Sequence, residues 1–179
     1  MHLTNLNFSY RKRKIFNNFH LKIETKTINL FKGGNGAGKT TLLKIATGLI
    51  PLLNKKHQLK EMFSYCPDYL NLPSHLFAFE FFSLFDGDYQ SLMIRFKLPN
   101  IKIGKMSKGM KQKVILIVAL MKKAEIYLFD EVDANLDKLT LESLKDIFLE
   151  LKKQGKTIIL VSHHYEIFEN IADTTWQIN

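Results

Sequence analysis

Short apolar runs alternate along this chain with longer segments in which apolar residues recur every three or four positions. Two strand-like runs, at 3–8 and 19–23, flank the basic segment 11–14 and predict an N-terminal antiparallel hairpin. A third apolar run, 28–31, leads directly into a cluster of glycines. This order of elements indicates a hairpin, a buried strand and then a loop with unusual backbone freedom.

The rest of the chain continues the alternation of strands and helices. Helices are predicted at 40–49, 106–123 and 141–151, and further strands at 62–65, 126–129, 157–161 and 175–178. The run 126–129 is wholly apolar, which is typical of a strand buried on both faces of a parallel sheet, and 157–161 is expected to be another buried strand. The pattern therefore predicts an α/β fold with a mostly parallel core sheet and antiparallel strands at its N-terminus.

The segment 73–96 is rich in aromatic residues. Phe77, Phe81, Leu84 and Phe85 fall on one stripe of a predicted helix. Such a stripe is most often core, and the alternative is a hydrophobic groove that receives a short helix from a membrane partner.

Composition narrows the class of protein. With 179 residues and no linker-like segment, the chain is expected to form one domain, 1–179. Its only cysteine, Cys66, excludes an internal disulfide and favours a cytoplasmic location. The longest apolar run, 114–121, is far shorter than the roughly 20 residues that span a bilayer. The net charge of +9 comes almost entirely from lysine, which suits solvated faces, phosphates or an anionic membrane surface better than base-specific contacts, so nucleic acid is an unlikely partner.

The glycine cluster matches the phosphate-binding pattern G-x-x-x-x-G-K-[ST] over 33–40, between a predicted strand and a predicted helix. Glycines let the backbone wrap around phosphate oxygens, while Lys39 reaches the β- and γ-phosphates and the Thr40 hydroxyl binds Mg²⁺. The alternative, an ordinary glycine-rich turn, explains neither the spacing nor the flanks. We expect the nucleotide to be held by Gly33, Asn35, Gly36, Ala37, Gly38, Lys39, Thr40 and Thr41.

Asp130 and Glu131 follow the buried run 126–129. A carboxylate at the end of such a strand would lie beside the phosphate loop, where Asp130 holds Mg²⁺. Strand alternation would point Glu131 to the other side, where it takes a proton from the attacking water.

The segment Met106-Ser107-Lys108-Gly109-Met110 opens the helix before Asp130 and resembles the signature motif of ATP-binding-cassette (ABC) ATPases. In that family, two nucleotide-binding domains pack head to tail. The resemblance implies that Ser107 and Gly109 of one copy close over the γ-phosphate held by the other. Lys108 and Met110 depart from the usual glycine and glutamine, in a form similar to drug, peptide and polysaccharide exporters.

Other positions follow the same order of motifs. Ala134-Asn135-Leu136-Asp137 resembles the D-loop at the dimer interface, with Asp137 also placed as a helix N-cap. His163, rather than His164, resembles the histidine that contacts the γ-phosphate. Tyr10 lies where the family stacks an aromatic ring on adenine, and its alternative is a core tyrosine.

One motif position differs more from the family. The family has a glutamine that contacts Mg²⁺ after the strand that corresponds to 62–65. In this chain Asp68 occupies that position. Asp68 is expected to be a metal ligand, and the alternative is a turn residue after proline. The short stretch 69–105 implies a reduced helical subdomain.

The resemblance implies an ATPase subunit of an ABC transporter with ATP and Mg²⁺ as ligands. Its catalytic residues would be Lys39, Glu131 and His163. The partners would be a second ATPase subunit and an integral-membrane permease, so the protein would lie at the inner face of the cell membrane and most simply serve an exporter. Two alternatives stay open: a soluble ABC ATPase, for example of the iron–sulfur assembly type, and a catalytically weakened dimerisation module.

Overall fold

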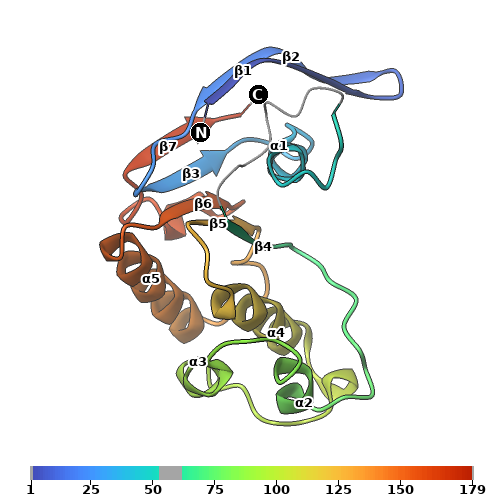
Figure 1. Cartoon of the computed structure of the whole chain (residues 1–179), viewed down its shortest axis with the longest axis vertical. Coiled ribbons are helices and arrows are strands. Elements are labelled where there is room, and N and C mark those ends of the chain that lie inside the picture. The colour runs from blue at the N-terminus through green and yellow to red at the C-terminus, as the bar shows by residue number, and fades with distance from the viewer. Residues whose placement is uncertain (1, 53–61, 179) are drawn as a thin grey trace.

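The computed structural model describes residues 2–52 and 62–178 and is built around one five-stranded sheet (Figure 1). The strands lie in the order β4-β5-β6-β3-β7, and every neighbouring pair is parallel. They are β3 (Ile28–Lys32), β4 (Phe63–Cys66), β5 (Ile126–Asp130), β6 (Thr157–Val161) and β7 (Thr174–Gln177). The α/β fold with a parallel core sheet is confirmed.

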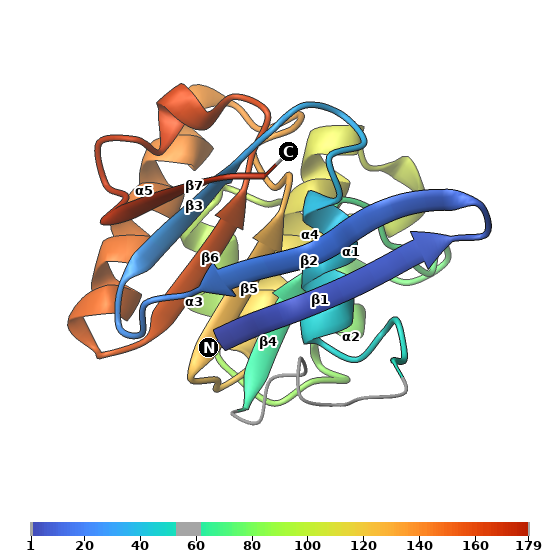
Figure 2. The same ribbon diagram turned by 90° about the horizontal axis from the view of Figure 1, so that it is seen from above.

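The N-terminal hairpin is a separate layer. β1 (His2–Tyr10) and β2 (Arg13–Lys22) pair antiparallel, and the hairpin crosses above the sheet with α1 (Lys39–Ala46) beneath it (Figure 2). The helix ends at 46 rather than at 49, because Gly48 has a φ of +75° and the chain turns there, before Pro51 acts as a stop.

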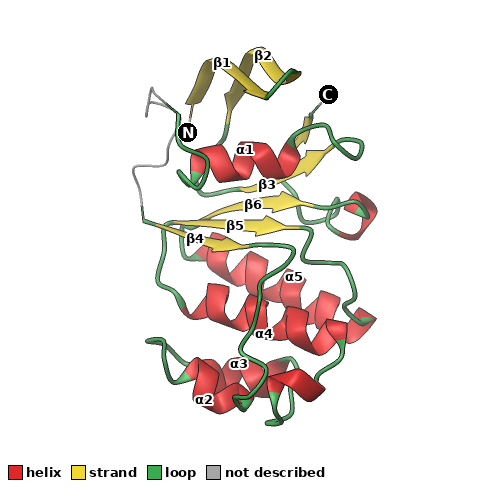
Figure 3. Cartoon of the chain, turned by 90° about the vertical axis from the view of Figure 1, so that its right-hand side faces the viewer, coloured by secondary structure: helices red, strands yellow, loops and turns green. Residues whose placement is uncertain are grey.

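Helices cover the opposite face of the sheet in two layers (Figure 3). The inner layer is α4 (Lys108–Met121) and α5 (Lys138–Lys153), and the outer layer is α2 (Ala78–Phe82) and α3 (Tyr89–Arg95). Two 3₁₀ turns, Ile103–Lys105 and Tyr165–Ile167, complete the elements. Within residues 2–52 and 62–178, no helix is both long and apolar enough to cross a bilayer.

Each face of the sheet carries its own apolar core. Toward α4 and α5, Phe129 packs on Phe148 with ring centroids 4.7 Å apart, and Phe148 packs in turn on Phe168. Toward α1 and the hairpin, Leu42 and Leu128 belong to a second cluster. Because both faces of the sheet are covered, β5 and β6 are buried along their whole length.

The predicted helical stripe in the segment 73–96 is wrong. α2 ends at Phe82 and the chain turns at Gly87, whose φ is +138°, so Leu84 and Phe85 are not part of a helix. Phe81 is buried in the core, whereas Leu84 is 70% exposed. The side chains of the predicted stripe therefore lie partly in the core and partly on the surface.

Candidate functional site

The carboxyl ends of three parallel strands meet at one edge of the sheet and bring three loops together. The glycine loop follows β3, Asp130 ends β5 with Glu131 next to it, and His163 lies just after β6. This edge is where open α/β sheets bind ligands. A cavity of about 520 Å³ opens there. It is lined by Tyr10, Arg13, Ile15, Asn35, Gly36, Gly38, Lys39, Thr40, Thr41, Glu131 and His163.

The Lys39 ammonium is buried at the floor of this cavity. The side chain begins α1, is only 4% exposed, and donates hydrogen bonds to the carbonyl oxygens of Gly33 at 2.7 Å and Gly34 at 3.0 Å. Among the described residues no carboxylate pairs with it in a salt bridge. A buried cation held only by carbonyl oxygens is costly unless an anion compensates it. The cavity is therefore built to receive negative charge.

Gly38 shapes the loop at the start of α1. Its φ is +98°, a conformation that favours glycine, and an added Cβ would lie 2.7 Å from Cγ2 of Ile15 and 2.9 Å from Cζ of Phe16. Both contacts come from β2. A side chain at this position would push the hairpin away from the loop, so the second glycine of the motif is required by packing as well as by backbone conformation.

Asp130 is almost fully buried and holds two hydrogen bonds. Its Oδ1 accepts from the Thr40 hydroxyl and its Oδ2 from the Tyr65 phenol, each at 3.0 Å. Burial raises the pKa of Asp130 above its usual range, and the two hydrogen bonds oppose that shift. Burial, followed by the nearby Asp130 charge, raises the pKa of Tyr65, so the phenol keeps its proton and remains a donor.

Glu131 and His163 form a direct pair on the wall of the cavity. Their Oε1 and Nε2 atoms are 2.7 Å apart. The expectation that Glu131 points to the other side of the strand end is wrong, because its backbone is left-handed, with a φ of +53°, and turns its side chain into the same cavity as Lys39 and Thr40. His164 is 71% exposed at its side chain and contacts Asp133 instead, which leaves His163 as the cavity histidine.

The hairpin supplies the remaining wall. Tyr10 is half-exposed at the cavity rim, with its ring edge-on to Phe8, so one ring face is available to a flat ligand. Sequence reasoning missed Arg13, which lines the cavity three residues after Tyr10 and whose Nη2 lies 3.4 Å from the carbonyl oxygen of Gly36. Its place in the hairpin turn, close to Tyr10, was the signal that could have identified it.

Gly33 and Ala37 lie beneath the cavity rather than on its wall. The Gly33 carbonyl accepts from Lys39, and Ala37 packs on the α1 side of the sheet.

Four other predicted site residues do not line this cavity: Ser107, Gly109, Asp68 and Asp137. Ser107 caps α4 by accepting a hydrogen bond from the Met110 amide, and it is exposed. Gly109 approaches the D-loop segment so closely that an added Cβ would be 2.4 Å from the Asn135 carbonyl oxygen. Asp68 is exposed in the loop after β4 and does not line the cavity. No group of three or more His, Cys, Asp or Glu side chains in the described residues could hold a metal ion by itself.

Asp137 has a structural role in this chain. Its carboxylate caps α5, accepting from the amide and hydroxyl of Thr140, and pairs with Lys113 at 2.9 Å. The hydrogen bond from Lys113, and then that from the Thr140 amide, hold the pKa of Asp137 well below its usual range. The N-cap expected from the sequence is present and also ties α5 to α4.

We expect Asp137→Asn to lower the free energy of unfolding at neutral pH by about 1 kcal/mol, since asparagine keeps the cap, the lost ion pair is exposed on its carboxylate side, and the buried Lys113 ammonium keeps its hydrogen bond to the Phe96 carbonyl oxygen. Because the pKa of Asp137 is depressed in the folded state, its carboxylate stabilises the fold at pH values above the unfolded pKa of about 3.9. This stabilisation is lost as the pH falls below that value, so the difference in free energy of unfolding between the variant and the wild type should be smaller at about pH 3. Urea unfolding at both pH values measures this. Asp146→Asn, an exposed position on the same helix, is the control, and a pH-independent difference would contradict the ion pair.

Comparison with known proteins agrees with this geometry. The family described as "ABC transporter" matches residues 16–134. An uncharacterized ABC transporter ATP-binding protein of Bacillus subtilis, YybJ, is 30% identical over 98% of this chain and 90% of its own length. The lantibiotic transport ATP-binding protein SrtF of Streptococcus pyogenes is 28% identical over 96% of this chain and 83% of its own. The zinc import ATP-binding protein ZnuC of Buchnera aphidicola is 32% identical over 92% of this chain and 74% of its own length.

A solved structure shares the fold. The dimeric post-hydrolysis state of the ATP-binding cassette MJ0796, bound to ADP and Pi, superposes with a TM-score of 0.82 at 20% identity and covers 99% of this chain and 94% of that one. The sequence relatives include both a lantibiotic transport protein and a zinc importer, so likeness supports the family and not the exporter branch. The chain belongs to the ABC transporter family and is an ABC transporter ATPase.

Proposed function

We propose that this chain hydrolyses ATP as one of two head-to-tail ATPase subunits that drive a separate membrane permease, with residues 1–179 acting as one domain and 69–105 as its reduced helical subdomain. The observation that carries the proposal is the buried Lys39 ammonium, whose hydrogen-bond partners among the described residues are carbonyl oxygens and which lies within the same cavity as Thr40 and Glu131. The oxygens of a triphosphate would accept further hydrogen bonds from the Lys39 ammonium. The loop backbone and the first turn of α1 would add N–H donors around the same phosphates, and Tyr10 would cover the adenine.

Thr40 and Asp130 fit a bound Mg²⁺ ion. They place a hydroxyl oxygen and a buried carboxylate oxygen 3.0 Å apart, and both are hard oxygen donors of the kind that Mg²⁺ takes beside substrate phosphates. When bound there, Mg²⁺ would offset negative charge on the phosphates. Asp68 is the third metal residue of this proposal, and its charge is close enough to contribute to the raised pKa of Asp130.

Glu131 and His163 would act on the water that attacks the γ-phosphate. Glu131 is a carboxylate on the cavity wall, in position to accept a proton from that water or to hold it in line. The contact of 2.7 Å with His163 orients the Glu131 carboxylate and leaves the imidazole facing the transferred phosphoryl group. Lys39 stabilises the charge that develops on the same group.

A second copy would complete the site. Ser107, Gly109 and Asp137 do not line the cavity of their own chain, while Ser107 sits exposed at the N-terminus of the 14-residue helix α4. A helix N-terminus with an exposed serine, whose hydroxyl can still donate its own proton, is suited to meet an anion held by another subunit. MJ0796, which shares this fold, forms a dimer in its nucleotide-bound state.

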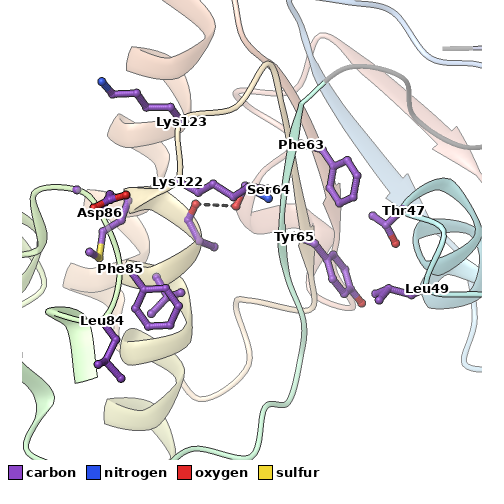
Figure 4. Close-up of a pocket in the computed structure, with 14 residues that line it drawn as sticks. Thr47, Leu49, Phe63, Ser64, Tyr65, Leu84, Phe85, Asp86, Lys122 and Lys123 are labelled. Carbon is purple, nitrogen blue, oxygen red and sulfur yellow. Dashed lines mark hydrogen bonds between the residues drawn. The ribbon is translucent and has the colours of Figure 1, made fainter. Parts of the chain in front are cut away.

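The permease is proposed to dock in a groove of about 990 Å³ that runs along the edge strand β4. The groove lies between the end of α1, the end of α4 and the turn that holds Leu84 and Phe85. Figure 4 shows Phe63 and Tyr65 pointing toward Thr47 and Leu49, while Ser64 points the other way. Leu49, Leu84 and Phe85 are exposed apolar side chains, which an amphipathic helix would cover.

This arrangement would hold the protein at the inner face of the cell membrane. The charge of +9 adds attraction to anionic lipids. The Ser107-Lys108-Gly109-Met110 form of the signature favours an exporter as the partner permease.

Leu84→Asp tests the groove, because a charge there would cost several-fold in permease affinity while ATP binding stays unchanged. The measurement is recovery of the integral-membrane permease with the tagged full-length chain from detergent-solubilised native membranes. Ile94→Asp, on α3 and 79% exposed outside the groove, is the matched control. Equal recovery of the permease with both variants would exclude this groove, and purely soluble complexes with the wild type would favour the non-transport ABC ATPase.

A further inference from the structure

We propose that Tyr65 is a positioning residue that fixes the carboxylate of Asp130 for metal binding, an inference that rests on the function proposed above. The phenol donates to Oδ2 of Asp130 at 3.0 Å, while the Thr40 hydroxyl donates to Oδ1 at the same distance. Tyr65 does not line the nucleotide cavity. It acts on the site only through Asp130.

The sheet register explains how Tyr65 reaches the carboxylate. Tyr65 of β4 lies opposite Leu128 of β5, two residues before Asp130. Since side chains alternate along a strand, Tyr65, Leu128 and Asp130 all project from the face that carries α1. The long phenol ring extends along this face toward the end of β5, and its hydroxyl meets the buried carboxylate.

The hydrogen bond determines which oxygen of Asp130 is available. Asp130 is 1% exposed, so bulk water cannot replace a missing donor. A carboxylate that loses one of two donors in such a site either rotates or leaves a buried oxygen without a partner. With the phenol in place, Oδ2 is occupied and Oδ1 stays directed at Thr40, the other oxygen donor of the proposed metal site. Partners of this kind around metal ligands typically govern metal affinity by about 10- to 100-fold.

The ring of Tyr65 has a separate packing role. It lines the groove beside Phe63 and Leu49, as Figure 4 shows, and it packs on the α1 side of the sheet. Phenylalanine would keep these contacts and remove only the hydroxyl. Tyr65→Phe is therefore the variant that separates the hydrogen bond from the packing.

The experiment measures Mn²⁺ binding to the ATP complex of the full chain, from the electron paramagnetic resonance signal of free Mn²⁺, with Mn²⁺ as the probe for the Mg²⁺ site. We expect Tyr65→Phe to weaken Mn²⁺ binding about 10- to 100-fold, while ATP affinity in EDTA changes less than about twofold because Tyr65 does not line the cavity. In turnover assays the Mg²⁺ concentration for half-maximal rate should rise and kcat at saturating Mg²⁺ should recover.

Tyr127→Phe is the matched control. It removes a phenol from the next strand, where the hydroxyl donates to the Lys122 carbonyl oxygen at 2.9 Å, remote from Asp130. Its Mn²⁺ affinity should equal that of the wild type, whatever its effect on melting temperature.

Combining Tyr65→Phe with Asp130→Asn tests whether Tyr65 acts through Asp130. Tyr65→Phe should add little further loss of Mn²⁺ affinity in that background. The proposal is overturned if Tyr65→Phe binds Mn²⁺ as the wild type does, or if its effect is as large without the Asp130 carboxylate. If the wild type binds ATP but Asp130→Asn leaves its Mn²⁺ affinity unchanged, the proposed metal site fails instead.

Discussion

Glu131→Gln should reduce ATP turnover by about 100- to 10,000-fold while leaving ATP binding intact, because glutamine keeps the size and hydrogen bonding of the side chain but cannot accept a proton. The contact of 2.7 Å between Glu131 and His163 can persist through the amide oxygen. With hydrolysis blocked, the ATP-bound state accumulates, so the variant should elute as a dimer in Mg-ATP during gel filtration and as a monomer without nucleotide.

The matched control for this prediction is Glu125→Gln. Glu125 precedes β5 at the opposite end from Glu131 and pairs with Lys156, so the same chemical change is made outside the cavity. Its turnover should match that of the wild type. If Glu131→Gln hydrolyses ATP as fast as the wild type does, Glu131 is not part of the mechanism. If the wild type itself does not hydrolyse ATP, the result favours the catalytically weakened dimerisation module. A chain that stays monomeric in both variants and under all nucleotide conditions contradicts the head-to-tail sandwich.

Lys39→Ala should weaken ATP binding by about 30-fold or more, since removing one partner of a buried charge interaction costs about 2–5 kcal/mol and about 1.4 kcal/mol is a factor of ten. The loss should grow in the series AMP, ADP, ATP, because the ammonium lies at the phosphate end of the cavity. Isothermal titration calorimetry with the three nucleotides measures it. Without the ammonium, the Gly33 and Gly34 carbonyl oxygens also lose their shared donor, so the loop itself loosens.

Lys44→Ala separates this effect from a change in net charge. Lys44 lies on the same helix, outside the cavity, and its loss alters charge by the same amount. Its ATP affinity should stay within about twofold of the wild type, because Lys44 lies in the last turn of α1, outside the cavity, where water and salt screen its charge from the phosphates. Unchanged ATP binding in Lys39→Ala would show that the glycine loop is not the phosphate site.

Local signals predicted the glycine loop and most of the sheet. The spacing of Gly33, Gly38 and Lys39 encodes a backbone conformation within a few residues, and the run 126–129 encodes a strand buried on both faces whatever its neighbours are. The strand at Thr157–Val161 was predicted to the residue. Such features depend on nearby side chains alone, so the sequence is sufficient to find them.

Features that depend on distant contacts were not predictable in the same way. The stripe through Phe81, Leu84 and Phe85 had helical spacing, but α2 ends at Phe82 and the chain turns away before Gly87. Strand alternation misplaced Glu131, because its left-handed backbone is set by the chain's turn after β5, where its amide donates to the Val161 carbonyl oxygen.

The sequence by itself determined the order of the motifs, the parallel α/β architecture and the residue types available for phosphate and metal chemistry. Only the tertiary structure decided which of them meet. Lys39, Asp130 and His163 are far apart in the chain and converge because the carboxyl ends of parallel strands share one edge. Tyr65 holds Asp130 because β4 and β5 pair in the register that sets Tyr65 opposite Leu128. Register and convergence are properties of the packed sheet, and no single segment carries them.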